Sequence, residues 1–166
     1  MKKIFAVAAA AMILGAGTAM AAPVNHLTGN ETAVGVGSKE SYVEHKFTSK
    51  LTAGYQYVDR DQYNKQNDLY AQYDLVGSNV RAIAGWRNNL PGDKSNLYGG
   101  LALSTPAVMG FEAYVSYVAG GDFNETQVGI NKNLVANVDL NINYHNYAPE
   151  HGHNEHGIGA GVTVKF

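Results

Sequence analysis

Four of the six histidines of this 166-residue chain lie close together near its carboxyl terminus. His151, His153 and His156 alternate with Glu150 and Glu155, and imidazole and carboxylate groups at this density can ligate zinc, copper or nickel. A short His-rich tract is a compositional indication of metal binding, so these three histidines are candidate metal ligands. Their spacing matches no standard site, and a solvated surface loop is the alternative interpretation.

Serine, histidine and aspartate side chains also occur in other polar stretches, and these residue types carry nucleophilic catalysis. No pattern places a base beside a nucleophile together with a third group that would orient it. The sequence contains no glycine-rich phosphate loop, no cysteine and no HExxH motif. We therefore expect a protein that is not an enzyme and that uses no cofactor.

The elements that would position these residues are predicted by strict alternation. Over residues 157–166, apolar side chains alternate with Gly, Thr and Lys up to the terminal aromatic ring of Phe166. A period of two is the signature of a β-strand whose two faces meet different surroundings. The same pattern predicts strands within residues 51–57, 69–75, 80–86, 97–103, 111–117, 128–130 and 138–144, and two shorter ones at 32–37 and 41–47.

Between these strands, two kinds of connection alternate. Short turn-like stretches fall at residues 48–50, 77–79, 105–110 and 133–137, and longer polar stretches fall at 59–66, 88–95, 120–124 and 148–156. Tight turns on one side and longer loops on the other are typical of an up-and-down transmembrane barrel. We therefore predict an all-β fold, a transmembrane antiparallel β-barrel of about ten strands over residues 22–166.

Two other folds are compatible with the same pattern. One is an eight-stranded barrel with residues 22–47 lying outside or within it. The other is a secreted β-sandwich or lipocalin-like barrel, whose apolar face would point inward. Glycines on the polar face, such as Gly85 and Gly129, suit a crowded interior, and aromatic residues near strand ends suit a membrane interface, so both features favour the membrane barrel.

Residues 1–21 have the features of a secretory signal peptide. Lys2 and Lys3 precede an apolar stretch, and Ala19-Met20-Ala21 forms a small-x-small cleavage site. Removal of this leader leaves ten Lys and Arg residues against 14 Asp and Glu residues, an acidic balance that disfavours binding to nucleic acid. Because cysteine does not occur, we expect neither disulfide bonds nor a lipoprotein anchor.

The predicted strands carry charge on their inward face. Six charged residues lie on that face within a few residues of a tight turn or the carboxyl terminus: Lys46, Asp74, Arg81, Glu112, Asp139 and Lys165. Unpaired charges inside a narrow barrel are costly, so we expect this charge ring to form an interlocked cluster of salt bridges and hydrogen bonds that blocks the lumen. Above this ring we expect an uncharged polar lining made of Gln56, Tyr70, Gln72, Tyr98, Tyr114, Gln127, Asn141 and Asn143.

The leader, the alternating strands and the terminal Phe166 together resemble small bacterial outer-membrane β-barrel proteins, the group of OmpX/Ail barrels, OmpA-type barrels and small porin-like proteins. The resemblance implies a place in the outer membrane among its lipids, with both termini in the periplasm. It also implies recognition by the outer-membrane assembly machinery, with Val162, Val164 and Phe166 as the carboxyl-terminal signal. Ten predicted strands depart from the eight of OmpX-like proteins.

Two functions follow from this resemblance and from the predicted interior. The first is a structural or surface-interaction role for a barrel with a plugged lumen, in which an extracellular ligand would meet the rim loops. The second is a small porin-like channel that passes ions or small polar solutes along the polar lining. A ten-stranded barrel has little more room inside than the side-chain-filled eight-stranded one, which disfavours a wide pore.

Overall fold

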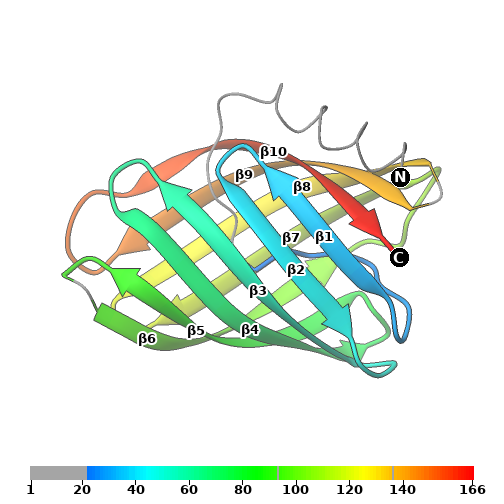
Figure 1. The fold of residues 1–166 in the computed structure, drawn as a ribbon, viewed down its shortest axis with the longest axis horizontal. Helices are drawn as coiled ribbons and strands as arrows, with labels where there is room; N and C mark the ends of the chain where they lie inside the picture. Colours follow the sequence, from blue (N-terminus) through cyan, green and yellow to red (C-terminus); the bar gives the residue numbers. More distant parts are fainter. Residues whose placement is uncertain (1–21, 93, 136) are drawn as a thin grey trace.

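The computed structural model describes residues 22–166 except 93 and 136, and this part of the chain forms a single closed barrel of ten antiparallel strands. Each strand pairs with its neighbours in sequence, and β1 pairs with β10 (Figure 1). The strands are β1 (Thr32–Gly37), β2 (Glu40–Lys46), β3 (Leu51–Arg60), β4 (Asn64–Val76), β5 (Val80–Leu90), β6 (Lys94–Ser104), β7 (Phe111–Gly120), β8 (Phe123–Val135), β9 (Val138–Pro149) and β10 (Glu155–Lys165). The predicted signal peptide lies outside the described residues.

The prediction of ten strands is confirmed, and the eight-stranded alternative is wrong. Residues 32–46 are part of the wall, because β1 pairs with β10 from Ala33↔Lys165 to Gly37↔Gly161 and β2 pairs along β3. Thr32 and Phe166 also exchange two backbone hydrogen bonds of 2.8 and 2.9 Å, so the carboxyl terminus is tied to the first strand. Closure leaves no strand edge unpaired, which removes the backbone groups that an open sheet would expose.

The barrel has two distinct ends. At one end lie the start of β1, Phe166 and the connections after β2, β4, β6 and β8, and we call it the termini end. At the other end, the opposite end, the predicted longer loops are mostly strand: β3 runs to Arg60 and β4 begins at Asn64, and β7 runs to Gly120 and β8 begins at Phe123. Polar composition suggested loops there, but polar side chains in these stretches, such as Gln66 and Glu155, are buried on the inward face of continuing strands.

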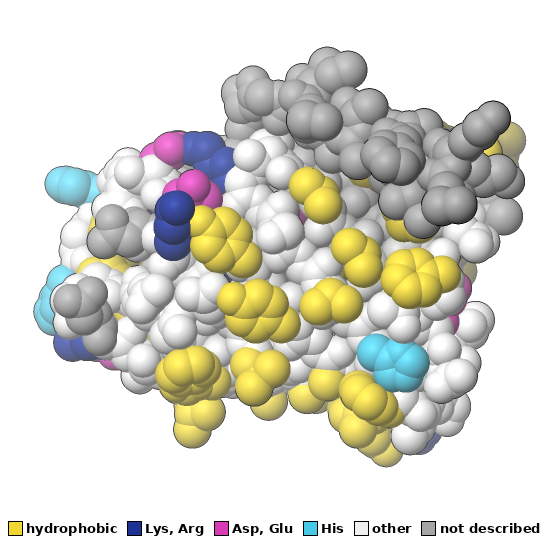
Figure 2. Space-filling model, viewed as in Figure 1, with side chains coloured by type: hydrophobic (Ala, Val, Ile, Leu, Met, Phe, Trp, Pro, Cys, Tyr) yellow, Lys and Arg dark blue, Asp and Glu magenta, His cyan; other side chains and the backbone are white. Residues whose placement is uncertain are grey.

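The two faces of the wall have opposite character. In β7, the outward residues Phe111 and Tyr117 are about half exposed, whereas Glu112 and Ser116 between them are buried. The other long strands repeat the pattern, and hydrophobic side chains cover the middle of the wall shown in Figure 2 while charged ones gather towards its ends. In the described residues, no helix has the length and apolar character needed to cross a membrane.

Four tyrosines fill part of the interior by lying across glycines. Each tyrosine stands directly opposite a glycine of the adjacent strand, in the pairs Gly35–Tyr42, Gly54–Tyr70, Gly85–Tyr98 and Gly129–Tyr114. A Cβ atom at any of these glycines would come within 2.1 to 2.5 Å of the opposite tyrosine side chain. The rings therefore need glycine beneath them, as the predicted crowded interior requires at Gly85 and Gly129.

Candidate functional site in the barrel lumen

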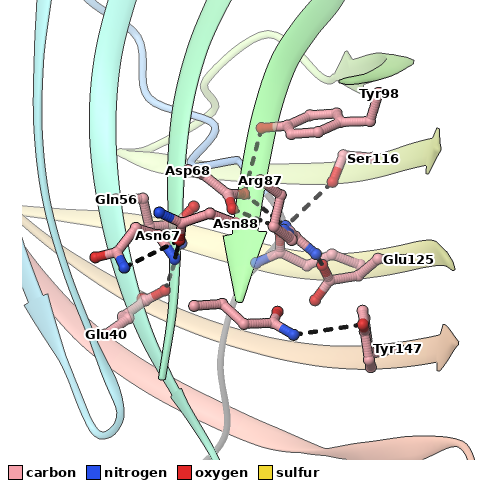
Figure 3. A network of polar contacts seen from close by, with 12 residues as sticks. Glu40, Gln56, Asn67, Asp68, Arg87, Asn88, Tyr98, Ser116, Glu125 and Tyr147 are labelled. Carbon is pink, nitrogen blue, oxygen red and sulfur yellow. Dashed lines mark hydrogen bonds and ion pairs between the residues drawn. The ribbon is translucent and has the colours of Figure 1, made fainter. Parts of the chain in front are cut away.

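A buried cluster of polar side chains in the lumen is centred on Arg87 (Figure 3). The Arg87 guanidinium donates two hydrogen bonds to the carboxylate of Asp68, at 2.7 and 2.6 Å, and a third to Glu125 at 2.7 Å. The three side chains come from β5, β4 and β8, and none of them is exposed to solvent. One guanidinium thus joins two carboxylates on different parts of the wall, the bidentate geometry in which Arg binds most strongly.

Arg60 extends this cluster to a fourth strand. Its Nη2 donates to both oxygens of Glu125 at 2.9 Å, and its Nε donates to Gln66 at 2.7 Å. The Arg60 guanidinium lies 3.9 Å from the centre of the Tyr147 ring, and that of Arg87 lies 4.5 Å from the Phe123 ring. We call Arg60, Asp68, Arg87 and Glu125 the charged network. Aromatic faces and paired carboxylates surround both of its cations, which offsets part of their cost of burial.

The charged network corrects the prediction for this level of the barrel. An uncharged lining was expected above the charge ring, but Gln56, Tyr70, Gln72, Tyr98, Tyr114, Gln127, Asn141 and Asn143 share the buried interior with four fully buried charges. The signal was present in the sequence, because Asp68 and Arg87 each continue the inward alternation of a predicted strand by one step. One predicted strand begins at residue 69, just after Asp68, and the other ends at residue 86, just before Arg87.

The six residues of the predicted charge ring all lie buried or largely buried at the termini end, but they do not all pair directly with one another. Asp74 accepts from Lys46 at 2.6 Å and lies 3.4 Å from Arg81. Asp139 pairs with Lys165 at 2.6 Å. Glu112 pairs with His26, a residue outside the predicted ring, whose Nδ1 lies 2.6 Å from the carboxylate. The direct ion pairs therefore form three groups. Hydrogen bonds connect these groups through His26, which contacts Glu112, Lys165 and Ser78, and the carbonyl of Ser78 accepts from Arg81.

The histidine-rich tract is tied to the neighbouring turn and does not gather into a metal site. His151, His153 and His156 are all exposed, and no group of three or more His, Cys, Asp or Glu residues within the described chain could hold a metal ion. The backbone carbonyl of His153 instead accepts a hydrogen bond from the Tyr63 hydroxyl at 2.5 Å. The structure therefore does not bring these three histidines together as a metal site, and all three side chains are exposed to solvent.

The predicted assembly-signal residues lie on the strand that closes the barrel. Val162 and Val164 stand opposite Val36 and Val34 of β1, and Phe166 follows the end of β10. Val162 is buried, Val164 is half-buried, and the Phe166 side chain is exposed at the termini end. The terminal ring is therefore accessible while its backbone remains bonded to Thr32.

These observations define the class of protein. It is an all-β, closed, antiparallel up-and-down barrel with an apolar outer face and a charged, tightly packed interior. No family model matches the chain, and no curated protein matches it. Similar solved structures include a de novo designed transmembrane β-barrel, with a TM-score of 0.43 and 13% identity over 86% of this chain and 100% of the designed one. The N-terminal β-barrel domain of Pseudomonas aeruginosa OprF is also similar, with a TM-score of 0.42 and 10% identity over 84% of this chain and 100% of that domain. The fold assigned to this chain rests on its own strand pairing.

Proposed function

We propose that this protein is an integral outer-membrane β-barrel with a closed lumen, which acts as a structural or surface-interaction protein without enzymatic activity. One observation carries the proposal: the barrel buries its charges and exposes its hydrophobic side chains. Arg87 and Glu125 have no solvent exposure, while Leu69 and Leu97 are 61% and 77% exposed. In water this distribution would be unfavourable, whereas in lipid the exposed apolar side chains are in their preferred surroundings.

The dimensions of the wall support a membrane span. A transmembrane strand needs about 9 to 11 residues at a tilt near 45°. The eight strands from β3 to β10 have 10 to 13 residues each. β1 and β2 are shorter, with 6 and 7 residues, so Val34, Val36 and Val43 supply the exposed apolar surface on that side. Exposed aromatic side chains, among them Tyr73, Trp86, Tyr117 and Tyr144, suit the two lipid interfaces.

The charged network supports closure of the lumen. Arg87 and Arg60 meet on Glu125, so ion pairs run from β3, β4 and β5 to β8 on the other part of the wall. A hydrated ion passing this level would have to separate these pairs, and a buried charge that loses its partner costs about 3 to 5 kcal/mol. A small porin-like channel, the alternative function, would require a continuous wet path past these four residues.

Short connections at the opposite end set the form of any surface contact. Lys39 pairs with Asp61, and Lys94 pairs with Asp122, so these ion pairs link neighbouring turns across the rim. A partner would therefore meet a compact rim and not long protruding strands. On this proposal the rim at the opposite end faces outward, and both termini lie in the periplasm, where the assembly machinery reaches Phe166.

The single tryptophan tests the membrane location. Trp86 lies on the outward face of β5 and is 42% exposed. In vesicles whose acyl chains carry bromine, we expect Trp86 fluorescence to be quenched strongly. The control variant combines Trp86→Phe with Tyr98→Trp, which moves the indole into the lumen, and it should resist the same quencher. Quenching of Trp86 by aqueous acrylamide but not by brominated lipid would refute the membrane location.

Planar-bilayer recording tests the closed lumen. The purified, folded protein is expected to give no steady conductance, because no hydrated path passes the charged network. Lys39→Ala removes a rim pair outside the lumen and should be equally silent. Steady wild-type conductance would refute closure and favour the porin-like channel, and conductance gained by Lys39→Ala alone would place the barrier at the rim.

A further inference from the structure

Residues 22–27, which precede the first strand, lie inside the barrel. Ala22, Val24 and Leu27 are buried, with 0%, 2% and 6% of their surface exposed. The chain leaves this position at the termini end and then turns into β1 (Figure 1, blue trace). These residues have no strand partners, so side chains of the wall must hold them in place.

Two backbone carbonyls of this segment bind to different parts of the wall. Gln72 of β4 donates a 2.6 Å hydrogen bond to the carbonyl of Pro23, and Asn131 of β8 donates a 2.8 Å hydrogen bond to the carbonyl of Val24. Three strands separate β4 from β8 on one side and five on the other, so the segment bridges the lumen. Pro23 has no N–H group, which leaves one donor fewer to satisfy in this buried position.

Side chains of the segment make the remaining polar contacts. Asn25 donates to Glu44 at 2.8 Å and to the Tyr42 hydroxyl at 3.0 Å. His26 uses both ring nitrogens, with Glu112 at 2.6 Å and with the Ser78 hydroxyl at 2.5 Å.

The carbonyl of His26 accepts a further hydrogen bond from Lys165 at 2.9 Å. Two residues of the predicted charge ring, Glu112 and Lys165, therefore bind the segment. They are not limited to pairing with the other charges of the wall.

An apolar contact completes the fit. Ala22 and Val24 belong to one buried cluster with Tyr70, Ile83 and Ala102, which lie on the inward faces of β4, β5 and β6. Apolar side chains on the inner wall of a barrel would be wetted if the segment left. The cluster therefore favours occupancy of this part of the lumen by residues 22–27.

We propose that residues 22–27 form a removable internal plug that fills the termini-end half of the lumen, in series with the charged network. The plug is held by side-chain contacts and not by strand pairing, so it can leave while all ten strand pairs stay intact. The proposal rests on the proposed function, because only a wall covered by lipid or detergent restricts access to the two ends of the lumen.

Thiol labelling tests the plug, because the chain has no cysteine and a single introduced one is the only thiol. Ala102→Cys places the reporter in the cluster that the plug contacts. In detergent micelles, a charged methanethiosulfonate should label it slowly. Val24→Arg puts a charge into that cluster and should displace the plug. If the plug normally occupies the lumen nine-tenths of the time or longer, its displacement should speed labelling by about tenfold or more.

Matched variants separate loss of the plug from loss of the fold. Val24→Ile keeps an apolar side chain and should leave labelling slow. Val58→Cys places the reporter directly opposite Gln66, which binds Arg60 of the charged network, and it should stay protected in the Val24→Arg background if the barrel is folded. Lys50→Cys in an exposed turn should react rapidly in every background.

The double variant Asn25→Ala with His26→Ala gives a second, milder test, because it removes four side-chain hydrogen bonds of the plug and introduces no charge. It should also speed labelling of Ala102→Cys. Rapid labelling of Ala102→Cys with an unaltered segment would overturn the proposal, and so would slow labelling in both displaced backgrounds. Trp86 quenching by brominated lipid does not depend on the plug, so it reports separately on the proposed function.

Discussion

Single residues close this barrel by two means, ion pairing and ring packing. Arg87 satisfies two carboxylates at once, which a lysine point charge could not do with the same geometry. Tyr98 connects the two means, because its hydroxyl donates to Asp68 at 3.3 Å while its ring lies across Gly85. The absence of a side chain at Gly85 therefore positions a hydrogen-bond donor of the charged network.

Gly85→Ala tests this packing at the residue scale. The new Cβ would come within 2.4 Å of the Tyr98 ring, so the ring must move and we expect a loss of about 1 to 3 kcal/mol in the free energy of unfolding. Gly99→Ala is the control, because its nearest neighbouring atom would lie 3.9 Å away. Urea unfolding in micelles measures both. Equal stability of the two variants would show that Tyr98 does not require the glycine.

At the scale of the elements, the connections of the opposite end are joined to one another. Lys94, the first residue of β6, donates a 2.9 Å hydrogen bond to Asp122 in the turn between β7 and β8. Asn96 donates to the same carboxylate. Two neighbouring hairpins are thus joined above the barrel wall, and the bond from Lys94, the larger cause, lowers the pKa of Asp122.

A pH titration tests this link between hairpins. Because the folded-state pKa of Asp122 is lowered, the link should be complete above the unfolded pKa of Asp, about 3.9, and should be lost as the pH falls through the folded value. NMR titration of the Asp122 carboxyl carbon in micelles measures the folded pKa directly. Lys94→Ala should raise it, and Lys39→Ala, which removes a different rim pair, should not. An unchanged Asp122 titration in Lys94→Ala would contradict the assignment.

At the scale of the whole molecule, closure depends on the last strand meeting the first. β10 pairs with β1 over five positions and with β9 over ten. The exposed Phe166 ring lies at this seam, where its backbone binds Thr32. Recognition of this end by an assembly machinery would therefore act on the strand that completes the barrel.

Phe166→Ala tests that role in cells. We expect a several-fold lower yield of folded, heat-modifiable protein in the outer membrane, because the proposed recognition element is lost while strand pairing is kept. Phe47→Ala is matched, since Phe47 is 60% exposed at the same end but is not the terminal residue. Electrophoresis of unheated membrane fractions measures both yields. An equal loss in the two variants would assign the effect to general lipid contact.

The sequence by itself determined the strands and their two faces. In β7, Phe111 and Tyr117 point outward and Glu112 points inward, as alternation requires, because successive Cβ atoms of an extended chain always alternate. The same rule accounts for the inward position of Asp74 and Lys165. The rule also applies to Arg87, whose inward position was not predicted because the predicted strand ends at residue 86.

Only the tertiary structure decided which residues meet across the lumen. Arg60 and Glu125 are 65 positions apart, and His26 and Glu112 are 86 positions apart. Local alternation carries no information on the stagger and closure of the strands, which set the depth at which each inward side chain lies. Residues 22–27 have no alternation at all, so their course through the interior follows from the shape and the hydrogen-bonding groups of the closed barrel around them.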